Sequence, residues 1–392
     1  MCGVRGLQFD ATWAPRPGYR VSEFERRTRK AVTGSSVWRN PRLDLIEVPD
    51  PALGPLDVRL RPRACGVCGS DVHFYETDAD GYIRYPGLTK FPVIVGHEFS
   101  AEILEVGAGV RGLRAGDLVT VEEMIWCGAC VPCRNGWPNQ CENLEEVGFT
   151  INGAMAEQLV VGAKYCWPIT ALAEAYGSAD AGAEAGALCE PTSVAYNGMF
   201  VRAGGFRPGG IVAVYGTGPI GFAAIALARA AGASRVIAFE VSPVRQELAR
   251  KLGADEVHNP ADLAKAGASP HEIVLQASGG AGADLQVEAA GAPAITVPEM
   301  EQALAIGGKV VIIGRAAERA PMYLEYLQTR AGQVFGAQGH SGYGTFQHVI
   351  RLMASGRVDM RPIITSRFGL DSAPDAVVRA SQRRDGKVMV KF

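Results

Sequence analysis

Four cysteines crowd into one short stretch of the chain, and their spacing constrains the fold more tightly than any other feature. The pattern is Cys127-x2-Cys130-x2-Cys133-x7-Cys141. Four thiolates this close together can surround a zinc ion tetrahedrally, and a closed shell of protein ligands is typical of a structural site. We therefore predict a zinc-binding lobe over residues 122–145. Free loop thiols and an iron–sulfur cluster are the alternatives, but the lobe carries no other sign of redox chemistry.

A second set of potential metal ligands precedes this lobe. His97 and Glu98 lie side by side, and two thiols, Cys65 and Cys68, come earlier in the chain. A cysteine, a histidine and a carboxylate together are typical of catalytic zinc sites, which leave one position open for a substrate oxygen. A lone histidine in a strand is more often a core residue. The combination, rather than either motif alone, predicts a catalytic metal site.

A glycine-rich turn indicates a dinucleotide-binding fold. An apolar run at 211–215 leads into Gly-Thr-Gly-Pro-Ile-Gly at 216–221 and an alanine-rich helix. Such glycines allow a tight strand-to-helix turn and let the backbone approach a pyrophosphate at the helix N-terminus. Turn glycines with a surface glutamate are the alternative, but Glu240 ends the next strand, where a carboxylate can bond ribose hydroxyls and repel a 2′-phosphate. We predict NAD rather than NADP, bound by Gly216, Gly218, Pro219, Ile220, Gly221, Glu240 and Arg245.

Length and composition indicate a two-domain α/β protein. At 392 residues the chain exceeds the size, about 250–300 residues, at which single cores stop growing. The net charge of −2 argues against a nucleic-acid surface. No stretch approaches the ~20 apolar residues of a membrane helix, and the N-terminus has no hydrophobic signal core. We expect a soluble, cytoplasmic protein with a small-molecule substrate, whose nine cysteines favour metal sites over disulfides.

The pattern of elements changes along the chain. Residues 1–36 are charged and show little apolar periodicity, so we predict an appended arm there. Short alternating strands and turns then predict a β-rich domain over 37–192. Near-continuous apolar strands that alternate with helices predict a parallel sheet covered on both faces over 193–343. The final stretch, 344–392, is predicted to return to the first domain.

These three motifs, in this order, resemble the medium-chain zinc-dependent dehydrogenase/reductase family, which includes alcohol, sorbitol and threonine dehydrogenases. The resemblance covers roughly residues 37–392. It implies a GroES-like catalytic domain split around a Rossmann domain, which is a doubly wound parallel sheet. It also implies one structural and one catalytic zinc, NAD, and assembly into a homodimer or homotetramer. The charged segment before residue 37 and an Ala/Glu-rich insert at 171–187 depart from the family pattern, as does Ala101 in place of a glycine.

The resemblance also implies the roles of individual residues. It places the catalytic zinc ligand on Cys68 rather than Cys65, because the family's ligand precedes Gly and then Ser or Thr. Glu190 matches the sorbitol and threonine dehydrogenase pattern where alcohol dehydrogenases carry a zinc cysteine, although Cys189 is adjacent. Ser70 takes the place of the hydroxyl that receives the substrate proton, and His73 that of the imidazole that passes it to solvent. The implied metal ligands are Cys68, His97, Glu98 and Glu190, and the implied catalytic residues are Ser70, His73, Glu98 and Glu190.

Within the family, four segments resemble bacterial scyllo-inosose (inositol-type) dehydrogenases. They are Gly81–Thr89, Glu123–Cys127, Glu190–Asn197 and Gln338–Phe346. This narrower resemblance implies oxidation of a secondary hydroxyl on a cyclic polyol to a ketone. A sorbitol- or threonine-type enzyme on an acyclic substrate is one alternative, and a binding or regulatory protein without turnover is another. The candidate substrate contacts are Glu123, Asn197, Gln338 and His340, together with Tyr82 and Glu122.

Overall fold

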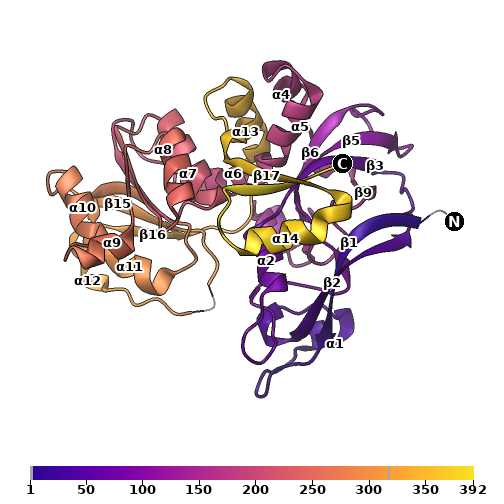
Figure 1. The fold of residues 1–392 in the computed structure, drawn as a ribbon, viewed down its shortest axis with the longest axis horizontal. Coiled ribbons are helices and arrows are strands. Elements are labelled where there is room, and N and C mark those ends of the chain that lie inside the picture. Colours follow the sequence, from indigo (N-terminus) through magenta and orange to yellow (C-terminus); the bar gives the residue numbers. More distant parts are fainter. Residues whose placement is uncertain (1–2, 317) are drawn as a thin grey trace. The chain divides into compact units, whose positions relative to one another are not determined.

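The computed structural model describes residues 3–316 and 318–392, and the chain divides into two compact units. The first unit ends at Glu190 and resumes at Ile364–Phe392, and the second is Pro191–Ile363. Strands and helices are mixed throughout, which confirms the predicted α/β class (Figure 1). The C-terminal return begins at Ile364 in this division, whereas the sequence pattern placed it at 344. The helix at Thr345–Ala354 thus lies in the second unit.

The first unit is built from mainly antiparallel strands with short helices, and β17 and β18 form a parallel pair. Its largest sheet has the order β10-β6-β5-β3-β18-β17, with β9 also paired to β3, so the C-terminal strand β18 lies beside β3. In Figure 1 the yellow elements near β17 accordingly lie among purple strands. The strands of this sheet are β3 (Asp57–Gly66), β5 (Glu98–Val106), β6 (Leu118–Val121), β9 (Leu159–Gly162), β10 (Cys166–Pro168), β17 (Ile364–Gly369) and β18 (Lys387–Lys391). The remaining elements are β7 (Met124–Ile125), β8 (Glu145–Glu146), α1 (Glu23–Thr28), α2 (Gly69–Tyr75), α3 (Val131–Arg134), α4 (Thr170–Ala175), α5 (Ala179–Ala187) and α14 (Ala373–Ser381).

The N-terminal segment is part of the first unit's fold. Strand β1 (Gly3–Trp13) pairs with β2 (Trp38–Pro49) and with β4 (Val93–Ile94). The side chains of Leu7 and Phe9 are fully buried in the main core. An appended arm was expected here, because the charged residues after position 15 obscure the short alternation from Leu7 to Trp13. Met1 and Cys2 lie outside the described residues.

The N-terminal segment also forms backbone hydrogen bonds with the loop that follows helix α2. Backbone N–H groups of Ala31, Ser35 and Asn40 donate to carbonyls of the loop at 81–89, each at 2.8 Å. The guanidinium of Arg16 lies 3.9 Å from the centre of the Tyr82 ring. A loop without its own sheet is thus held along its length by the first 40 residues.

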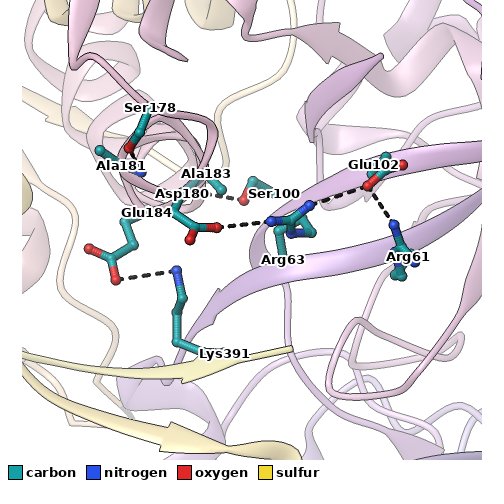
Figure 2. A network of polar contacts seen from close by, with 10 residues as sticks. All are labelled: Arg61, Arg63, Ser100, Glu102, Ser178, Asp180, Ala181, Ala183, Glu184 and Lys391. Carbon is teal, nitrogen blue, oxygen red and sulfur yellow. Dashed lines mark hydrogen bonds and ion pairs between the residues drawn. The ribbon is translucent and has the colours of Figure 1, made fainter. Parts of the chain in front are cut away.

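The insert at 171–187 forms helices α4 and α5, and α5 is fixed to the main sheet by polar contacts (Figure 2). The Ser100 hydroxyl donates to the Ala183 carbonyl over 2.6 Å, and Arg63 pairs with Asp180 at 2.9 Å. The buried face of α5 consists of glycines and alanines, so the helix can approach the sheet closely. A Cβ on Gly186 would lie 2.4 Å from the Ile169 side chain. The helix therefore gives a fixed start to the segment that carries Glu190.

The second unit is a parallel sheet with helices, as the alternating pattern predicts. Its strand order is β13-β12-β11-β14-β15-β16, so the order reverses between β11 and β14, a position where such sheets bind ligands. The strands are β11 (Ile211–Tyr215), β12 (Arg235–Phe239), β13 (Glu256–His258), β14 (Ala283–Glu288), β15 (Leu304–Ile312) and β16 (Gln333–Gly336). The helices are α6 (Cys189–Tyr196), α7 (Pro219–Ala230), α8 (Pro243–Lys251), α9 (Pro260–Lys265), α10 (Pro270–Ala277), α11 (Pro293–Gln302), α12 (Leu324–Thr329) and α13 (Thr345–Ala354), with a π-helical turn at Asn197–Arg202 after α6. Among the described residues, no helix is long and apolar enough to cross a membrane.

Candidate active site and metal centres

The four cysteines of the predicted lobe converge on one point. The Sγ atoms of Cys127, Cys130, Cys133 and Cys141 all lie within 4.8 Å of one another. Several backbone N–H groups point at these sulfurs, including those of Cys127 and Asn143, each 3.3 Å from the Cys141 Sγ. N–H groups of Ala129 and Cys130 lower the pKa of Cys127 to about 6, whereas burial raises the pKa of Cys133 and of Cys141. The convergence of four sulfur atoms, rather than these shifts, fits a tetrahedral zinc ion.

A second group of ligand atoms, from half-buried Cys68 and buried His97 and Glu98, forms at the N-terminus of α2. Cys68 is the N-cap of this helix, and its Sγ lies within 4.8 Å of ligand atoms of His97 and Glu98. Burial opposes a charge on the His97 ring, yet Cys68, Asp71 and then Glu190 raise the pKa of His97 well above its usual value. Such a concentration of negative charge in a buried place is what a bound cation neutralises. These residues therefore fit a catalytic zinc ion.

Asp71 and Ser70 flank the imidazole of His97 on opposite sides. The Asp71 carboxylate is fully buried, accepts the Cys68 N–H at 2.9 Å, and lies 3.9 Å from the His97 Nδ1. The Ser70 Oγ lies 3.4 Å from the other ring nitrogen, Nε2. A carboxylate beside the outer nitrogen orients a metal-binding imidazole. The predicted hydroxyl, Ser70, thus lies directly beside a predicted ligand.

Glu98 forms a buried ion pair that the sequence analysis did not anticipate. Its Oε2 accepts a hydrogen bond from the Nζ of Lys387, at the start of β18, and both side chains are almost fully buried. Lys387 also donates to the Val67 carbonyl at 3.1 Å. A Cβ on Gly66 would lie 2.2 Å from the Glu98 Oε2, so a larger residue there would displace this carboxylate. One carboxylate oxygen of Glu98 remains for a metal.

Glu190 and Glu123 lie close together inside the first unit. Both are buried, and a carboxylate oxygen of one lies within 4.8 Å of a carboxylate oxygen of the other. Glu190 is near enough to His97 that its charge raises the pKa of that ring. The neighbouring Cys189 has its thiol turned to the Ala185 carbonyl at 3.7 Å, and burial raises its pKa. Glu190, and not the adjacent Cys189, therefore affects the electrostatics of the candidate site.

The glycine turn of the second unit adopts the geometry expected of a pyrophosphate cradle. Gly216 has a φ of +84°, and a Cβ there would lie 2.6 Å from the Ala290 backbone. A Cβ on Gly221 would lie 2.0 Å from the Gly216 carbonyl oxygen, whereas one on Gly218 would meet nothing within 4 Å. Gly218 is the N-cap of α7, and Pro219 is its first residue. The open position is therefore at the helix N-terminus, where the N–H groups favour an anion.

Glu240 follows β12 and faces this turn. Its carboxylate accepts the Thr217 N–H at 2.8 Å, the Thr217 hydroxyl at 3.0 Å and the Ser242 N–H at 2.8 Å. These contacts fix both oxygens beside the glycine turn and leave lone pairs for further donors. Arg245 lies in the first turn of α8, three residues beyond Ser242.

Some of the candidate substrate residues have evident structural partners, and others lie together around the loop at 338–340. Glu122 accepts indole N–H groups of Trp126 and Trp167 at 3.1 and 2.8 Å, and Tyr82 lies under Arg16, so both have structural partners. Asn197 donates its amide to the carbonyls of Gln338 and Gly339 at 3.2 and 2.9 Å.

The loop that Asn197 holds carries Gln338 and His340. His340 is fully buried, and its ring lies 5.0 Å from that of Phe346. The structure thus brings Asn197, Gln338 and His340 together in the second unit. Glu123 lies beside Glu190 in the first unit.

Sequence reasoning missed Asp71, Lys387 and the aromatic support of His97. Asp71 could have been found, because its carboxylate caps the same helix whose N-cap is Cys68. The sequence around Lys387 does not indicate its role, because its partner Glu98 lies 289 positions away in the chain. Phe149 packs 4.6 Å from the His97 ring and follows the four-cysteine lobe in the chain. Both contacts depend on the tertiary fold.

Known proteins with similar sequences show to which family the chain belongs. Residues 54–171 match the alcohol dehydrogenase GroES-like domain, and residues 219–355 match the zinc-binding dehydrogenase model. The chain is 44% identical over 387 residues to scyllo-inosose 3-dehydrogenase of Thermotoga maritima, with 96% of each chain covered. It is 34% identical over 350 residues to L-threonine 3-dehydrogenase of Pyrococcus abyssi, covering 88% of this chain and 94% of that one.

Solved structures extend the likeness to the whole fold. A Thermotoga maritima structure, provisionally described as an alcohol dehydrogenase, has a TM-score of 0.93 and 43% identity, covering 99% of this chain and 100% of the other. A zinc-binding dehydrogenase structure from Sinorhizobium meliloti 1021, also provisionally described, is bound to NADP. It has a TM-score of 0.77 and 29% identity, covering 93% and 99% of the two chains.

These matches confirm the family resemblance and favour zinc over an iron–sulfur cluster in the four-cysteine lobe. They also confirm the enzyme class, an oxidoreductase acting on CH–OH groups, and its cofactors, zinc and a nicotinamide dinucleotide. The chain belongs to the zinc-binding, medium-chain alcohol dehydrogenase family.

Proposed function

We propose that this enzyme oxidises a secondary hydroxyl of a cyclic polyol, of the inositol, inosose or amino-cyclitol class, to a ketone with NAD. The observation that carries the chemistry is the group of Cys68, His97 and Glu98, with the Ser70 hydroxyl 3.4 Å from His97. A zinc ion held there, with Glu190 close by, would supply the positive charge that lowers the pKa of a substrate hydroxyl. A dinucleotide bound at the glycine turn would supply the hydride acceptor.

The chain's own residues carry the proton. Ser70 and His73 lie three residues apart on α2, so their side chains project from neighbouring positions on one helix face. Ser70 accepts the proton of the substrate hydroxyl while its own hydroxyl proton passes to the neutral imidazole of His73, which then releases that proton to solvent. The half-exposed ring of His73 suits this exit.

We infer a preference for NAD over NADP from Glu240. Its carboxylate is fixed beside the glycine turn, where it favours ribose hydroxyls and repels a 2′-phosphate. Glu240→Ala should raise the KM for NAD by about 10–100-fold, which is the effect of losing a charged hydrogen bond. It should also reduce the ratio of kcat/KM with NAD to kcat/KM with NADP. Glu247→Ala, on the exposed face of α8, is the matched control. A wild-type enzyme that uses NADP as readily as NAD would contradict the ribose assignment.

The cyclitol assignment rests on the 44% identity to scyllo-inosose 3-dehydrogenase and on the polar groups near the site. A pocket that bonds several hydroxyls rejects analogues without them, because its buried polar groups are then left unpaired. We expect kcat/KM for an inositol, inosose or amino-cyclitol to exceed that for ethanol, sorbitol or L-threonine by about 10²-fold or more. NADH absorbance with each substrate measures this, and NMR of the product identifies the carbon oxidised.

An acyclic substrate is the second candidate, because the chain is also 34% identical to an L-threonine 3-dehydrogenase. Equal or faster turnover of threonine or sorbitol would reject the cyclitol assignment and leave the zinc and dinucleotide chemistry intact. His340→Ala should lower cyclitol turnover far more than turnover of a small alcohol. A uniform loss with all substrates would instead assign His340 a structural role.

We further infer a homo-oligomer in the cytoplasm. Strand β16 is an edge of the parallel sheet, and exposed apolar side chains lie near it, including Val334, Ile306 and Leu324. Exposed edges of this kind pair readily with a second chain. Light scattering in solution that gives the mass of a monomer would reject the assembly.

A further inference from the structure

His73 has a charged neighbour on its own helix that the proposed chemistry does not use. Glu76 is the C-cap of α2, and its Oε2 lies 3.6 Å from the His73 Nδ1. The same carboxylate oxygen accepts a hydrogen bond from Arg383 at 2.9 Å. Arg383 has a φ of +53°, a left-handed conformation that is uncommon for a side chain of this kind. Glu76 is thus shared between a ring nitrogen and a guanidinium that reaches it from beyond α14.

Hydrogen bonds hold the backbone around His73 and Glu76 in place. The N–H of Arg84 donates to the carbonyls of both His73 and Glu76, at 2.9 and 3.1 Å, and the Glu76 N–H donates to Val72 at 2.8 Å. Arg84 belongs to the loop that the N-terminal segment holds. The ends of α2 and its loop therefore set the distance between the carboxylate and the ring.

We propose that Glu76, held by Arg383, is a positioning residue for His73: it keeps a proton on Nδ1 and so leaves Nε2 free to receive the proton that leaves the substrate. This inference rests on the proposed role of His73 in the reaction. A neutral imidazole has one N–H and one acceptor nitrogen, and the group bonded to the N–H decides which is which. At 3.6 Å the Glu76 carboxylate lies just beyond hydrogen-bond distance, and its negative charge favours a proton on Nδ1, which leaves Nε2 as the acceptor. No proton moves to Glu76 in this scheme.

The charges around His73 act in opposite directions. Burial lowers the pKa of His73, Glu76 raises it, and Arg383 and Arg84 lower it. Arg383 both fixes the carboxylate in place and weakens its pull on the ring. Next to the larger effect of burial, Glu76 and Arg383 therefore shift the proton affinity of His73 in opposite directions, in addition to any role in tying the two segments together.

A purely structural ion pair and a positioning pair predict different results. If the pair only ties α2 to the C-terminal segment, Glu76→Gln and Arg383→Gln should have the same effect, because each breaks the same contact. If it sets the affinity of the ring, Glu76→Gln should lower the pKa of His73 and Arg383→Gln should raise it. A nearby charge at this distance shifts a pKa by about one unit or more, a tenfold change in proton affinity.

The experiment is a pH titration of the histidine ring signals by NMR in the zinc-loaded protein, followed by the pH profile of kcat/KM. His73→Gln identifies the signal of His73 by its disappearance. His73 accepts a proton only when neutral, so the acid limb of kcat/KM should follow its pKa, to lower pH in Glu76→Gln and to higher pH in Arg383→Gln. The Glu76→Gln change should have no further effect on the profile in the His73→Gln background.

A second histidine–glutamate pair provides the matched control. His258 Nε2 lies 3.2 Å from the Glu256 Oε2 on β13, and Glu256→Gln should leave both the His73 signal and the profile unchanged. Shifts of the His73 titration in the same direction in both test variants, or no shift in either, would overturn the inference. If Arg383→Gln does not fold, as circular dichroism would show, Arg383→Lys, which retains the charge, should keep the wild-type titration.

Failure of the proposed function gives a different result. In that case His73→Gln would leave turnover unchanged, while the NMR titration would still report whether Glu76 controls the ring. A shifted NMR titration with an unchanged profile in Glu76→Gln would remove His73 from the reaction and overturn the positioning role.

Discussion

Cys130→Ser is expected to destabilise the protein sharply and to release one zinc ion per chain. Cys130 is one of four thiols whose sulfur atoms lie within 4.8 Å of one another, and its Sγ is 3.7 Å from that of Cys141. The free energy of binding a structural zinc ion is folding free energy, about 10–16 kcal/mol in small zinc-binding peptides. A whole domain is stable by only about 5–15 kcal/mol, so losing a ligand removes a large part of that margin.

Thermal unfolding and zinc analysis measure these effects. The wild type should contain about two zinc ions per chain and the variant about one, with a much lower unfolding midpoint. Cys166→Ser is the matched control, because Cys166 is a buried thiol of β10 outside the metal-binding groups found in the described residues. A fully active wild type with fewer than two zinc ions per chain would contradict the assignment.

His97→Ala is expected to leave a folded protein that binds NAD but does not turn over. His97 belongs to the group with Cys68 and Glu98, and Ser70 lies 3.4 Å from its ring. A catalytic metal contributes several kcal/mol to stabilising developing negative charge, which corresponds to a loss of about 10²–10⁴-fold in kcat. The four-cysteine lobe is separate in the chain, so the unfolding midpoint should fall far less than in Cys130→Ser.

Measurements of turnover and of cofactor binding distinguish a specific loss of catalysis from a general loss of folded structure. NADH fluorescence should show unchanged dinucleotide affinity, since the glycine turn lies in the second unit. His258→Ala, a change of the same kind on β13, should retain wild-type activity. Substantial turnover in His97→Ala would exclude this residue from the metal site.

Local spacing accounts for the features that could be predicted from the sequence. The four cysteines of the lobe lie close together in the chain, and the glycine turn joins one strand to the next helix, so each motif largely defines its own geometry. The Glu98–Lys387 pair could not be predicted, because its partners are 289 residues apart and meet only where β18 joins β3. Glu122 was predicted as a candidate substrate contact, but its carboxylate accepts hydrogen bonds from two indole N–H groups, which only the tertiary fold brings together.

Strand β1 shows a second reason why part of the fold could not be predicted from the sequence. Its buried side chains alternate, but a charged stretch follows within a few residues and dominates the composition of the whole segment. Short strands are recognised from patterns of only four to eight residues, so nearby charge easily outweighs them. The segment is ordered because β2 and β4 supply partners, and neither partner is evident from the first 36 residues.

The pairing of residues 31–40 with the loop at 81–89 constrains how such proteins can change over evolution. The loop's carbonyls at Gly81, Tyr85 and Thr89 depend on donors from the N-terminal segment, and the region shared with GroES-like domains begins only at residue 54. A gene shortened to that shared region would encode the loop without its partner strand, leaving backbone groups unpaired. Shortening of the N-terminus is therefore expected to be tolerated only together with shortening of the loop at 81–89, because the loop's carbonyls would otherwise lose their donors.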